Sequence, residues 1–315
     1  MKLSEEDRLL GKILPGLPGL DDLVVGPGDD CAVARVGGDL VLLKTDCIAE
    51  GIHFLRGQDP VRVGWKALCR PLSDIAAMGG DPLHALITIF SPPDLNPGYW
   101  VDFYRGIRKA ARKFGVAIAG GETSRQASGI AVSVALTGIA PGGRFVCRSG
   151  GRAGDLLFVT GRLGGSLSGH HLDFSPRLKE GRWLAETARP SAMMDISDGL
   201  GSDLPRLARA SGCGFEVDLA SLPLRQGSEI SGGLTDGEDY ELLFAIRPRR
   251  ASALVKMWKG KFPRTLLTCI GSLNATGSAP REWPDGWDHF SVVRSAQVRQ
   301  RSQGSAKNPR GQRSR

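Results

Sequence analysis

The sequence repeatedly places acidic residues beside Gly, Ser or Thr at the edges of apolar segments. Gly28-Asp29-Asp30 precedes the apolar run CAVARV, and Thr45-Asp46 closes the run LVLLKTD. Three further groups follow the same pattern: Leu72-Ser73-Asp74, Gly120-Gly121-Glu122-Thr123 and Asp195-Ile196-Ser197-Asp198-Gly199. This placement predicts acids that are presented at strand ends and helix ends around one cavity. Carboxylates gathered without cations repel one another, so we expect Mg²⁺ among them, which takes oxygen ligands and bridges to phosphates.

The acids, together with the missing nucleotide motifs, indicate a metal-dependent enzyme that acts on phosphates. The sequence contains neither GxxxxGK[ST] nor GxGxxG nor the protein-kinase signatures. Phosphoryl transfer suits a site rich in acids and metal ions, because its catalysis is mostly positioning and neutralisation of oxygen charge. The candidate ligands for several Mg²⁺ ions are Asp29, Asp30, Asp46, Asp74, Asp195 and Asp198. Arg148 and the backbone amides of Gly120-Gly121 can contact further phosphate oxygens, whereas Asp203 and Asp218 are predicted to be structural.

Length and composition predict a cytoplasmic protein with a large core. The chain has 315 residues, of which 41% are hydrophobic, enough for one large or two medium domains. It has no apolar run of about 20 residues that would span a bilayer, so we expect no membrane partner. The start, MKLSEEDRLL, lacks the apolar stretch of a secretory signal.

The basic charge of the chain is concentrated at its end. The formal net charge is +8, and the segment 294–315 carries seven basic residues and no acids, so the rest of the chain is close to neutral. This tail is rich in Ser, Gln, Gly and Arg, which predicts a disordered, solvated extension. Contact with nucleic acid or another acidic surface is the alternative for the tail, and we expect no nucleic-acid partner for the body of the protein.

The order of predicted elements indicates an α/β (α+β) protein of two domains. Residues 4–14 are predicted as a helix that Ser4 caps, and residues 33–46 as a hairpin that turns at Gly37-Gly38-Asp39. Asp59-Pro60 starts a helix that Pro71 should kink or divide, and VAIAGGETSR reads as a strand followed by a tight turn. The glycine-rich segment 141–155 marks the boundary. We therefore expect domains at residues 1–140 and 141–293, followed by the tail at 294–315.

Seven motifs, in this order, resemble the thiamine-monophosphate kinase family. They are GPGDDCAV, KTDCIAEGIHF, WKALCRPLSDIAAMGGDP, GGETSR, MMDISDGLGSDL, DGEDYELLF and GWDHF. This family belongs to the superfamily of aminoimidazole ribonucleotide synthetase, and the resemblance runs from about residue 4 to about residue 290. It implies two α/β domains and a homodimer whose N-terminal sheets join into a barrel. It also implies direct in-line transfer of the γ-phosphoryl group of ATP to thiamine monophosphate, which gives thiamine diphosphate.

The resemblance also implies a role for each residue that matches a family motif. The implied magnesium ligands are Asp30, Thr45, Asp46, Asp74, Glu122, Asp195 and Asp198. The implied ATP-binding residues are Gly121, Glu122, Arg148, Ser197 and Tyr104. The implied thiamine-phosphate-binding residues are His53, Glu238 and Trp287. No general base is required, because the accepting phosphate is already ionised at neutral pH.

The chain departs from the family pattern at several of these places. Glu122 stands where the family usually has Asp, and Lys44 where it usually has Ser or Thr. A lysine there either replaces the charge of one metal ion or blocks its site, so the number of bound ions stays open. Pro71 replaces the usual Asn and Asp236 the usual Gly, and the segment 169–176 is shorter than in the family.

Two alternatives remain beside a magnesium-dependent thiamine-monophosphate kinase. One is a related ATP-using enzyme of the same superfamily with another acceptor. The hydrogenase-maturation branch would need a C-terminal cysteine, and this sequence ends in Arg-Ser-Arg. The other alternative is a non-catalytic nucleotide-binding homologue, which the departures at Lys44 and Glu122 would favour.

Overall fold

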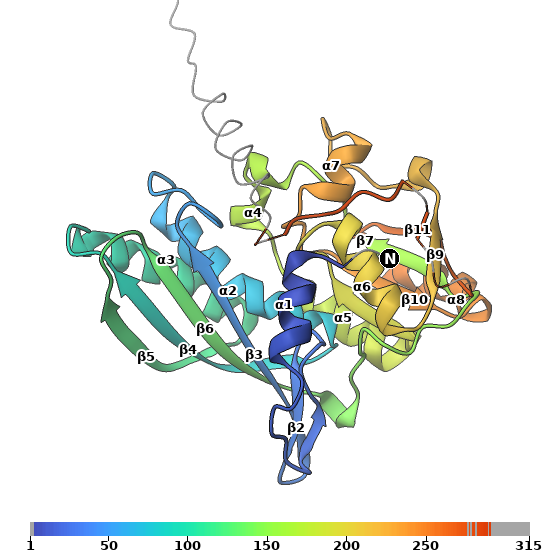
Figure 1. Ribbon diagram of the computed structural model, residues 1–315, viewed down its shortest axis with the longest axis horizontal. Helices are drawn as coiled ribbons and strands as arrows, with labels where there is room; N and C mark the ends of the chain where they lie inside the picture. The colour runs from blue at the N-terminus through green and yellow to red at the C-terminus, as the bar shows by residue number, and fades with distance from the viewer. Residues whose placement is uncertain (1–2, 276, 278, 281, 289, 291–315) are drawn as a thin grey trace, which may run out of the picture.

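The chain forms two β-sheets, each packed against helices, in the computed structural model (Figure 1). The structure describes residues 3–275, 277, 279–280, 282–288 and 290. The predicted basic tail, residues 294–315, lies outside these described residues. The mixture of strands and helices in both halves confirms the predicted α/β class.

The N-terminal sheet is mostly antiparallel and runs in the order β1-β2-β3-β6-β4-β5. Its strands are β1 (Leu23–Val25), β2 (Ala32–Val36), β3 (Asp39–Ala49), β4 (Asp81–Ser91), β5 (Ala117–Arg125) and β6 (Ala131–Ile139). The predicted hairpin is confirmed as β2 and β3, which pair from Ala32↔Leu43 to Val36↔Asp39. Among the described strands of this sheet only β4 and β5 pair in parallel, and α3 (Pro97–Phe114) forms the crossover that a parallel pair requires.

One face of the N-terminal sheet is covered by helices and the other is left open. Val132, Val134 and Leu136 alternate along β6 and are buried in the core that α2 (Pro60–Ala77) and α3 share with the sheet. On the opposite face Leu43 and Leu86 are 42% and 50% exposed. Figure 1 shows α2 and α3 on one side of these strands. The sheet therefore presents an apolar face that no described helix covers.

Helices α2 and α3 pack so closely that their backbones touch. A Cβ atom added at Gly64 of α2 would lie 2.0 Å from the carbonyl oxygen of Phe103. One added at Gly106 of α3 would lie 1.9 Å from the carbonyl oxygen of Val61. Only glycine allows this approach, and it places α2 firmly against the sheet and α3.

The C-terminal sheet is antiparallel throughout and is covered on both faces. Its strands are β7 (Leu156–Thr160), β8 (Ala192–Asp195), β9 (Gly214–Val217), β10 (Leu242–Ile246) and β11 (Leu267–Asn274), in the order β8-β10-β7-β11-β9. Leu243 on one face belongs to the core with α6 (Leu200–Ala210). Phe244 on the other face belongs to the core with α8 (Pro248–Lys261). All five residues of β10 are buried, as in a central strand.

The remaining elements are short, apart from α1. Helix α1 (Glu5–Ile13) begins with the predicted cap, since the Ser4 hydroxyl accepts the backbone N–H of Asp7 at 2.9 Å. The other elements are α4 (His170–Asp173), α5 (Leu178–Trp183) with a π-turn at Leu184–Ala188, α7 (Ile230–Thr235) and 3-10 turns at Pro141–Gly143, Ser166–Ser168 and Leu219–Ser221. None of the described helices is both long and apolar enough to cross a membrane.

One local prediction is decided in part and another is wrong. Pro71 does not divide α2, which runs unbroken to Ala77. Proline removes only its own N–H bond to the preceding turn, and burial along nearly the whole helix holds that turn in place. Gly120-Gly121 forms no turn but lies inside β5, where a Cβ at Gly121 would be 1.9 Å from the carbonyl oxygen of Ile87. Gly121 therefore allows the close approach of β4.

The glycine contact between α2 and α3 can be tested by substitution. Gly106→Ala should lower the free energy of unfolding by about 1–3 kcal/mol, because the new methyl group forces the helices apart. Gly11→Ala in α1 is the matched control, since nothing lies within 4 Å of its Cβ position and alanine favours a helix. Urea unfolding measures both. Equal stability of the two variants would contradict the described packing.

Candidate active site

Three buried carboxylates from distant parts of the sequence meet between the two sheets. Among the described residues, Asp30, Asp74 and Asp195 each offer one ligand atom, and these atoms lie within 4.8 Å of one another. Asp30 precedes β2, Asp74 lies in α2 and Asp195 ends β8. The Ser73 hydroxyl donates to Oδ2 of Asp195 at 2.6 Å and thereby joins α2 to the C-terminal sheet. We call these three acids the carboxylate cluster.

Burial strongly disfavours the charged form of the cluster. Burial, followed by the charge of Asp30, raises the pKa of Asp195 from 3.8 to about 7. Burial also raises the pKa of Asp74 well above its ordinary value, and the nearby Lys44 only partly offsets this. Uncompensated carboxylates at such a site need a positive partner in order to ionise near neutral pH.

One oxygen of each carboxylate in the cluster already has a protein partner. Oδ1 of Asp30 accepts Nη2 of Arg148 at 2.7 Å, and Oδ1 of Asp74 accepts Nζ of Lys44 at 2.7 Å. Oδ2 of Asp30 is buried and has no hydrogen-bond partner among the described residues. An unpartnered buried oxygen beside two further carboxylates is the donor set that Mg²⁺ prefers. The residues present therefore fit the predicted magnesium ion.

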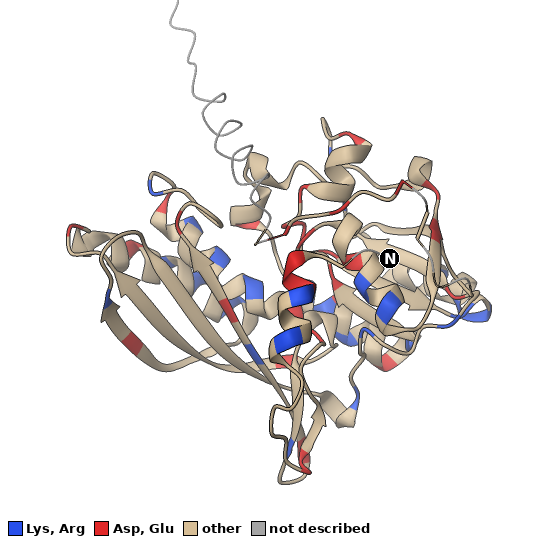
Figure 2. Cartoon of the chain, in the orientation of Figure 1, with Lys and Arg blue, Asp and Glu red and all other residues tan. Residues whose placement is uncertain are grey.

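Among the other predicted acidic ligands, Asp29 accepts the backbone N–H of Arg148 at 3.1 Å, and two are each paired with an arginine. Asp46 on β3 accepts Nη2 of Arg70 at 3.4 Å. Asp198 forms an ion pair with Arg206 of α6. Asp203 accepts the backbone N–H groups of Ser197 and Asp198 at 3.0 and 2.9 Å, as expected of a structural residue. Figure 2 shows acidic segments in the middle of the molecule, between the two sheets.

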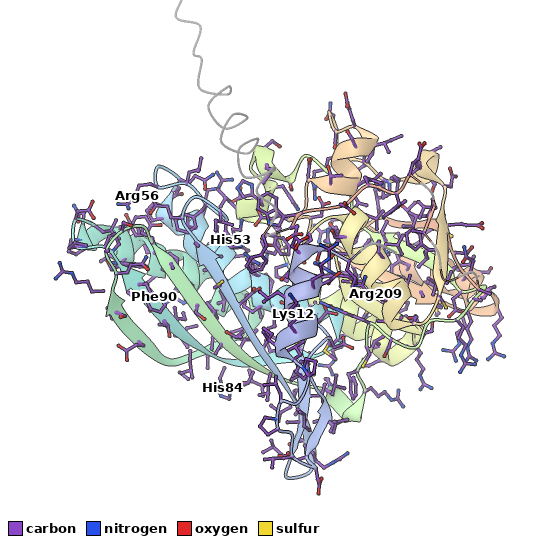
Figure 3. All side chains as sticks on the ribbon, viewed as in Figure 1. Lys12, His53, Arg56, His84, Phe90 and Arg209 are labelled. Carbon is purple, nitrogen blue, oxygen red and sulfur yellow. The ribbon has the colours of Figure 1, made fainter. Side chains whose placement is uncertain are left out.

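One pocket brings together all three residues predicted to bind thiamine phosphate. It is lined by Ile52, His53, Arg70, Leu167, Ser197, Asp198, Asp236, Gly237, Glu238, Tyr240 and Trp287. Figure 3 shows His53 in the middle of the molecule, near the C-terminal half. The backbone N–H groups of Glu238 and Trp287 donate to the carbonyl oxygens of Ser197 and Asp198 at 2.6 and 2.7 Å. The loops of the C-terminal domain are thus tied together at this pocket.

Lys66 positions two of these pocket residues from inside α2. Its side chain is fully buried, and Nζ donates to the carbonyl oxygen of His53 and to Oε1 of Glu238, both at 2.6 Å. Burial lowers the pKa of Lys66 to about 8, against the opposing charge of Glu238. His53 also accepts the N–H of Ala49 at Nδ1. One ammonium group therefore holds the backbone of His53 and the carboxylate of Glu238.

The structure leaves four predicted site residues away from the carboxylate cluster. The Thr45 side chain is exposed on the open face of the N-terminal sheet, because β3 alternates and points Lys44 and Asp46 toward α2. Gly121 and Glu122 lie on the edge strand β5, which β6 and β4 separate from β3, and Glu122 is exposed. Tyr104 is half-buried on α3 beside Phe103.

Sequence reasoning missed Lys66 and Arg70, which the structure places beside the pocket. The available signal was the segment WKALCR, in which two cations interrupt an otherwise apolar stretch of helix. Arg70 is 11% exposed, and its Nε and Nη1 are buried without a hydrogen-bond partner among the described residues. A buried cation with unpaired N–H groups is costly, so Arg70 indicates a ligand-binding site.

The comparisons with known proteins agree with this geometry. Residues 28–140 match the AIR synthase related protein N-terminal domain, and residues 169–260 match the C-terminal domain of the same class. The fold and the buried acids thus define an AIR synthase related protein. A thiamine-monophosphate kinase from Rhodopirellula baltica is 36% identical, over 86% of this chain and 92% of that protein. The chain belongs to the thiamine-monophosphate kinase family.

Further relatives and solved structures support this membership. The thiamine-monophosphate kinase of Aquifex aeolicus is 35% identical, over 84% of this chain and 92% of that protein. The solved structure of AaThiL complexed with AMPPCP and TMP has a TM-score of 0.77 and 33% identity, and covers 92% of this chain and 99% of that chain. The hydrogenase maturation protein HypE of Escherichia coli, at 20% identity and a TM-score of 0.66, shares the fold alone.

The raised pKa of Asp195 predicts a pH dependence of the metal-free protein. Between pH 3.8 and about 7 the folded state binds this proton and the unfolded state does not, so the free energy of unfolding falls as pH rises. Asp195→Asn cannot ionise, so its loss of stability over this range should be smaller by about 4 kcal/mol. Urea unfolding in EDTA measures this difference. Asp94→Asn, at an exposed acid, is the control, and an Asp195 variant that follows the wild-type profile would contradict the account.

Removing the buried ammonium of Lys66 should leave the carboxylate of Glu238 without its counter-charge. Lys66→Met leaves the Glu238 carboxylate without its cation and should lower the free energy of unfolding by about 3–5 kcal/mol. The double variant Lys66→Met/Glu238→Gln should recover part of this loss, because no charge is left unpaired. Urea unfolding of the single and double variants forms the cycle, and additive effects would contradict the pairing.

Proposed function

We propose that this chain is an ATP-dependent thiamine-monophosphate kinase that produces thiamine diphosphate. The observation that carries the proposal is the pocket of His53, Glu238 and Trp287, which lies beside the buried carboxylate cluster. Family membership and the similarity to AaThiL complexed with AMPPCP and TMP support the same substrates.

The chemistry of the pocket suits the cationic ring system of thiamine. Trp287 offers an aromatic face, on which a cationic thiazolium can stack. Glu238, Asp198 and Asp236 line the same pocket with carboxylates that favour a positive ligand. Arg70, at the same pocket, supplies the positive charge that a phosphate group needs. The pocket therefore has both signs of charge that thiamine monophosphate requires.

The carboxylate cluster is assigned to the part of the site that binds the phosphates. Asp30, Asp74 and Asp195 would hold Mg²⁺, which supplies positive charge to phosphoryl oxygens. Arg148, paired with Asp30, and Ser197, at the pocket, are assigned to ATP, as are Tyr104, Gly121 and Glu122 on the family pattern. Asp46 and Asp198, which pair with arginines, border the outer part of this site, and the side chain of Thr45, on the opposite face of the sheet, lies outside it. No side chain needs to remove a proton, because the accepting phosphate is already ionised.

The proposal includes a homodimer, two domains and a cytoplasmic location. The open apolar face of the N-terminal sheet, with Leu43 and Leu86 exposed, needs a cover, and the same sheet of a second copy would close it into a barrel. The domain division at residues 1–140 and 141–293 places one sheet in each domain. A cytoplasmic location follows from the use of ATP as co-substrate.

A direct assay tests the proposed function. Purified protein with ATP, Mg²⁺ and thiamine monophosphate should form thiamine diphosphate and ADP in equal amounts, detected by chromatography, and EDTA should abolish this. Hydrolysis of ATP without thiamine diphosphate would favour another acceptor, and binding of ATP without turnover would favour a non-catalytic homologue.

The pocket assignment predicts which kinetic constant a pocket variant changes. Trp287→Ala should raise KM for thiamine monophosphate about tenfold, because it removes an aromatic contact of about 1.5 kcal/mol, and leave KM for ATP unchanged. Steady-state kinetics with each substrate varied in turn measure both constants. A rise in KM for ATP alone would move Trp287 to the nucleotide side.

A further inference from the structure

Two protein cations lie beside one edge of the carboxylate cluster. Lys44 and Asp46 are two residues apart on β3, so both side chains point to the face that α2 covers. Nζ of Lys44 is 2.7 Å from Oδ1 of Asp74, and Nη2 of Arg70 is 3.4 Å from Oδ1 of Asp46. The ammonium and the guanidinium therefore lie among the very acids that the sequence predicted as metal ligands.

These cations are built into the site and do not reach it from the surface. The side chains of Lys44 and Arg70 are 20% and 11% exposed. Lys44 lies on the same face of β3 as Leu42 and Ile48, which are buried in the core beneath α2. Arg70 lies in α2 itself, within its long buried face. Neither side chain can swing into water without leaving a carboxylate unpaired in the interior.

An ammonium in this position competes with a divalent ion for the same oxygen. A Mg²⁺ ligand oxygen lies about 2.1 Å from its ion. An ion bound to Oδ1 of Asp74 would therefore overlap the ammonium nitrogen or lie next to it, and like charges at this separation repel strongly. Arg70 adds a second positive charge beside Asp46. This edge of the site is already neutralised.

The opposite edge of the cluster remains open to an ion. Oδ2 of Asp30 is buried and has no hydrogen-bond partner among the described residues. Asp195 uses Oδ2 to accept the Ser73 hydroxyl, and Asp74 uses Oδ1 to accept Lys44, so each retains its other oxygen. The two edges of one acidic site thus differ in charge.

We propose that Lys44 and Arg70 are permanent cations of the site that take the place of a divalent ion beside Asp46, and that one divalent-ion position remains at Asp30, Asp74 and Asp195. The inference rests on the proposed function only in that this position takes Mg²⁺. Part of the positive charge that faces the phosphates is then covalently bound to the protein and cannot dissociate when free Mg²⁺ is low.

The test counts bound ions, with Mn²⁺ as the spectroscopic substitute for Mg²⁺ and without nucleotide. Electron paramagnetic resonance of free Mn²⁺ during titration should show one site per wild-type chain. Lys44→Thr, which removes the ammonium, should add a second site, whereas Lys44→Arg, which keeps the charge, should still show one. Two sites in the wild type, or a single site in a folded Lys44→Thr variant, would overturn the inference.

A second variant keeps the inference testable if Lys44→Thr does not fold. Asp46→Asn should leave the Mn²⁺ affinity of the wild-type site within about threefold, because Asp46 is not one of its ligands on this proposal. A loss of about tenfold or more would place Asp46 among the ligands and contradict it. Circular dichroism confirms that each variant is folded.

The outcomes separate this inference from the proposed function. No Mn²⁺ bound to the wild type would contradict both the inference and the magnesium position. Formation of thiamine diphosphate in the direct assay would still support the kinase. Conversely, one Mn²⁺ bound to a protein that forms no thiamine diphosphate would leave the charge inference standing and contradict the kinase.

Discussion

The burial of like charges between two domains is the constraint on which this structure depends. Asp30, Asp74 and Asp195 are almost fully buried, and an ionised carboxylate in the interior is costly unless it is paired. Arg148 and Lys44 offset part of this cost by pairing with Asp30 and Asp74. One buried oxygen of Asp30 still lacks a partner among the described residues, which defines where further positive charge belongs.

Helix α2 connects this charge arrangement to the fold. It packs against the N-terminal sheet and α3 and also carries the site residues Lys66, Arg70, Ser73 and Asp74. Through Ser73 it bonds to Asp195, and through Lys66 it bonds to Glu238, so a single helix sets both the cluster and the pocket. Because glycines allow α2 and α3 to touch, the site rests on a rigid support. The acids and the pocket therefore depend on core packing as much as on loops.

The acids, the hairpin and the capped first helix could be predicted from the sequence because each depends on neighbouring residues. Ser4 signals a helix cap, and Gly37 marks a turn, whatever the rest of the chain does. The continuity of α2 through Pro71 could not be predicted, because it depends on burial by distant segments. The place of Gly121 inside β5 could not be predicted for the same reason, since it depends on the close approach of the β4 backbone.

The side to which each site residue points depended on the fold as a whole. Thr45 and Asp46 are adjacent in sequence and share a family motif, yet the pleat of β3 sends them to opposite faces of the sheet. Lys66 and Arg70 are site residues only because the fold places α2 beside the pocket. The sequence thus identified the acids of the site but not the charges that balance them.

The most direct measurement of the central claim is an anomalous-difference map from crystals soaked in Mn²⁺. The account predicts a single strong peak about 2.2 Å from carboxylate oxygens of Asp30, Asp74 and Asp195, and none in contact with Asp46. Absence of a peak at the cluster, or a peak that Asp46 and Asp74 share in place of the Lys44 ammonium, would contradict it.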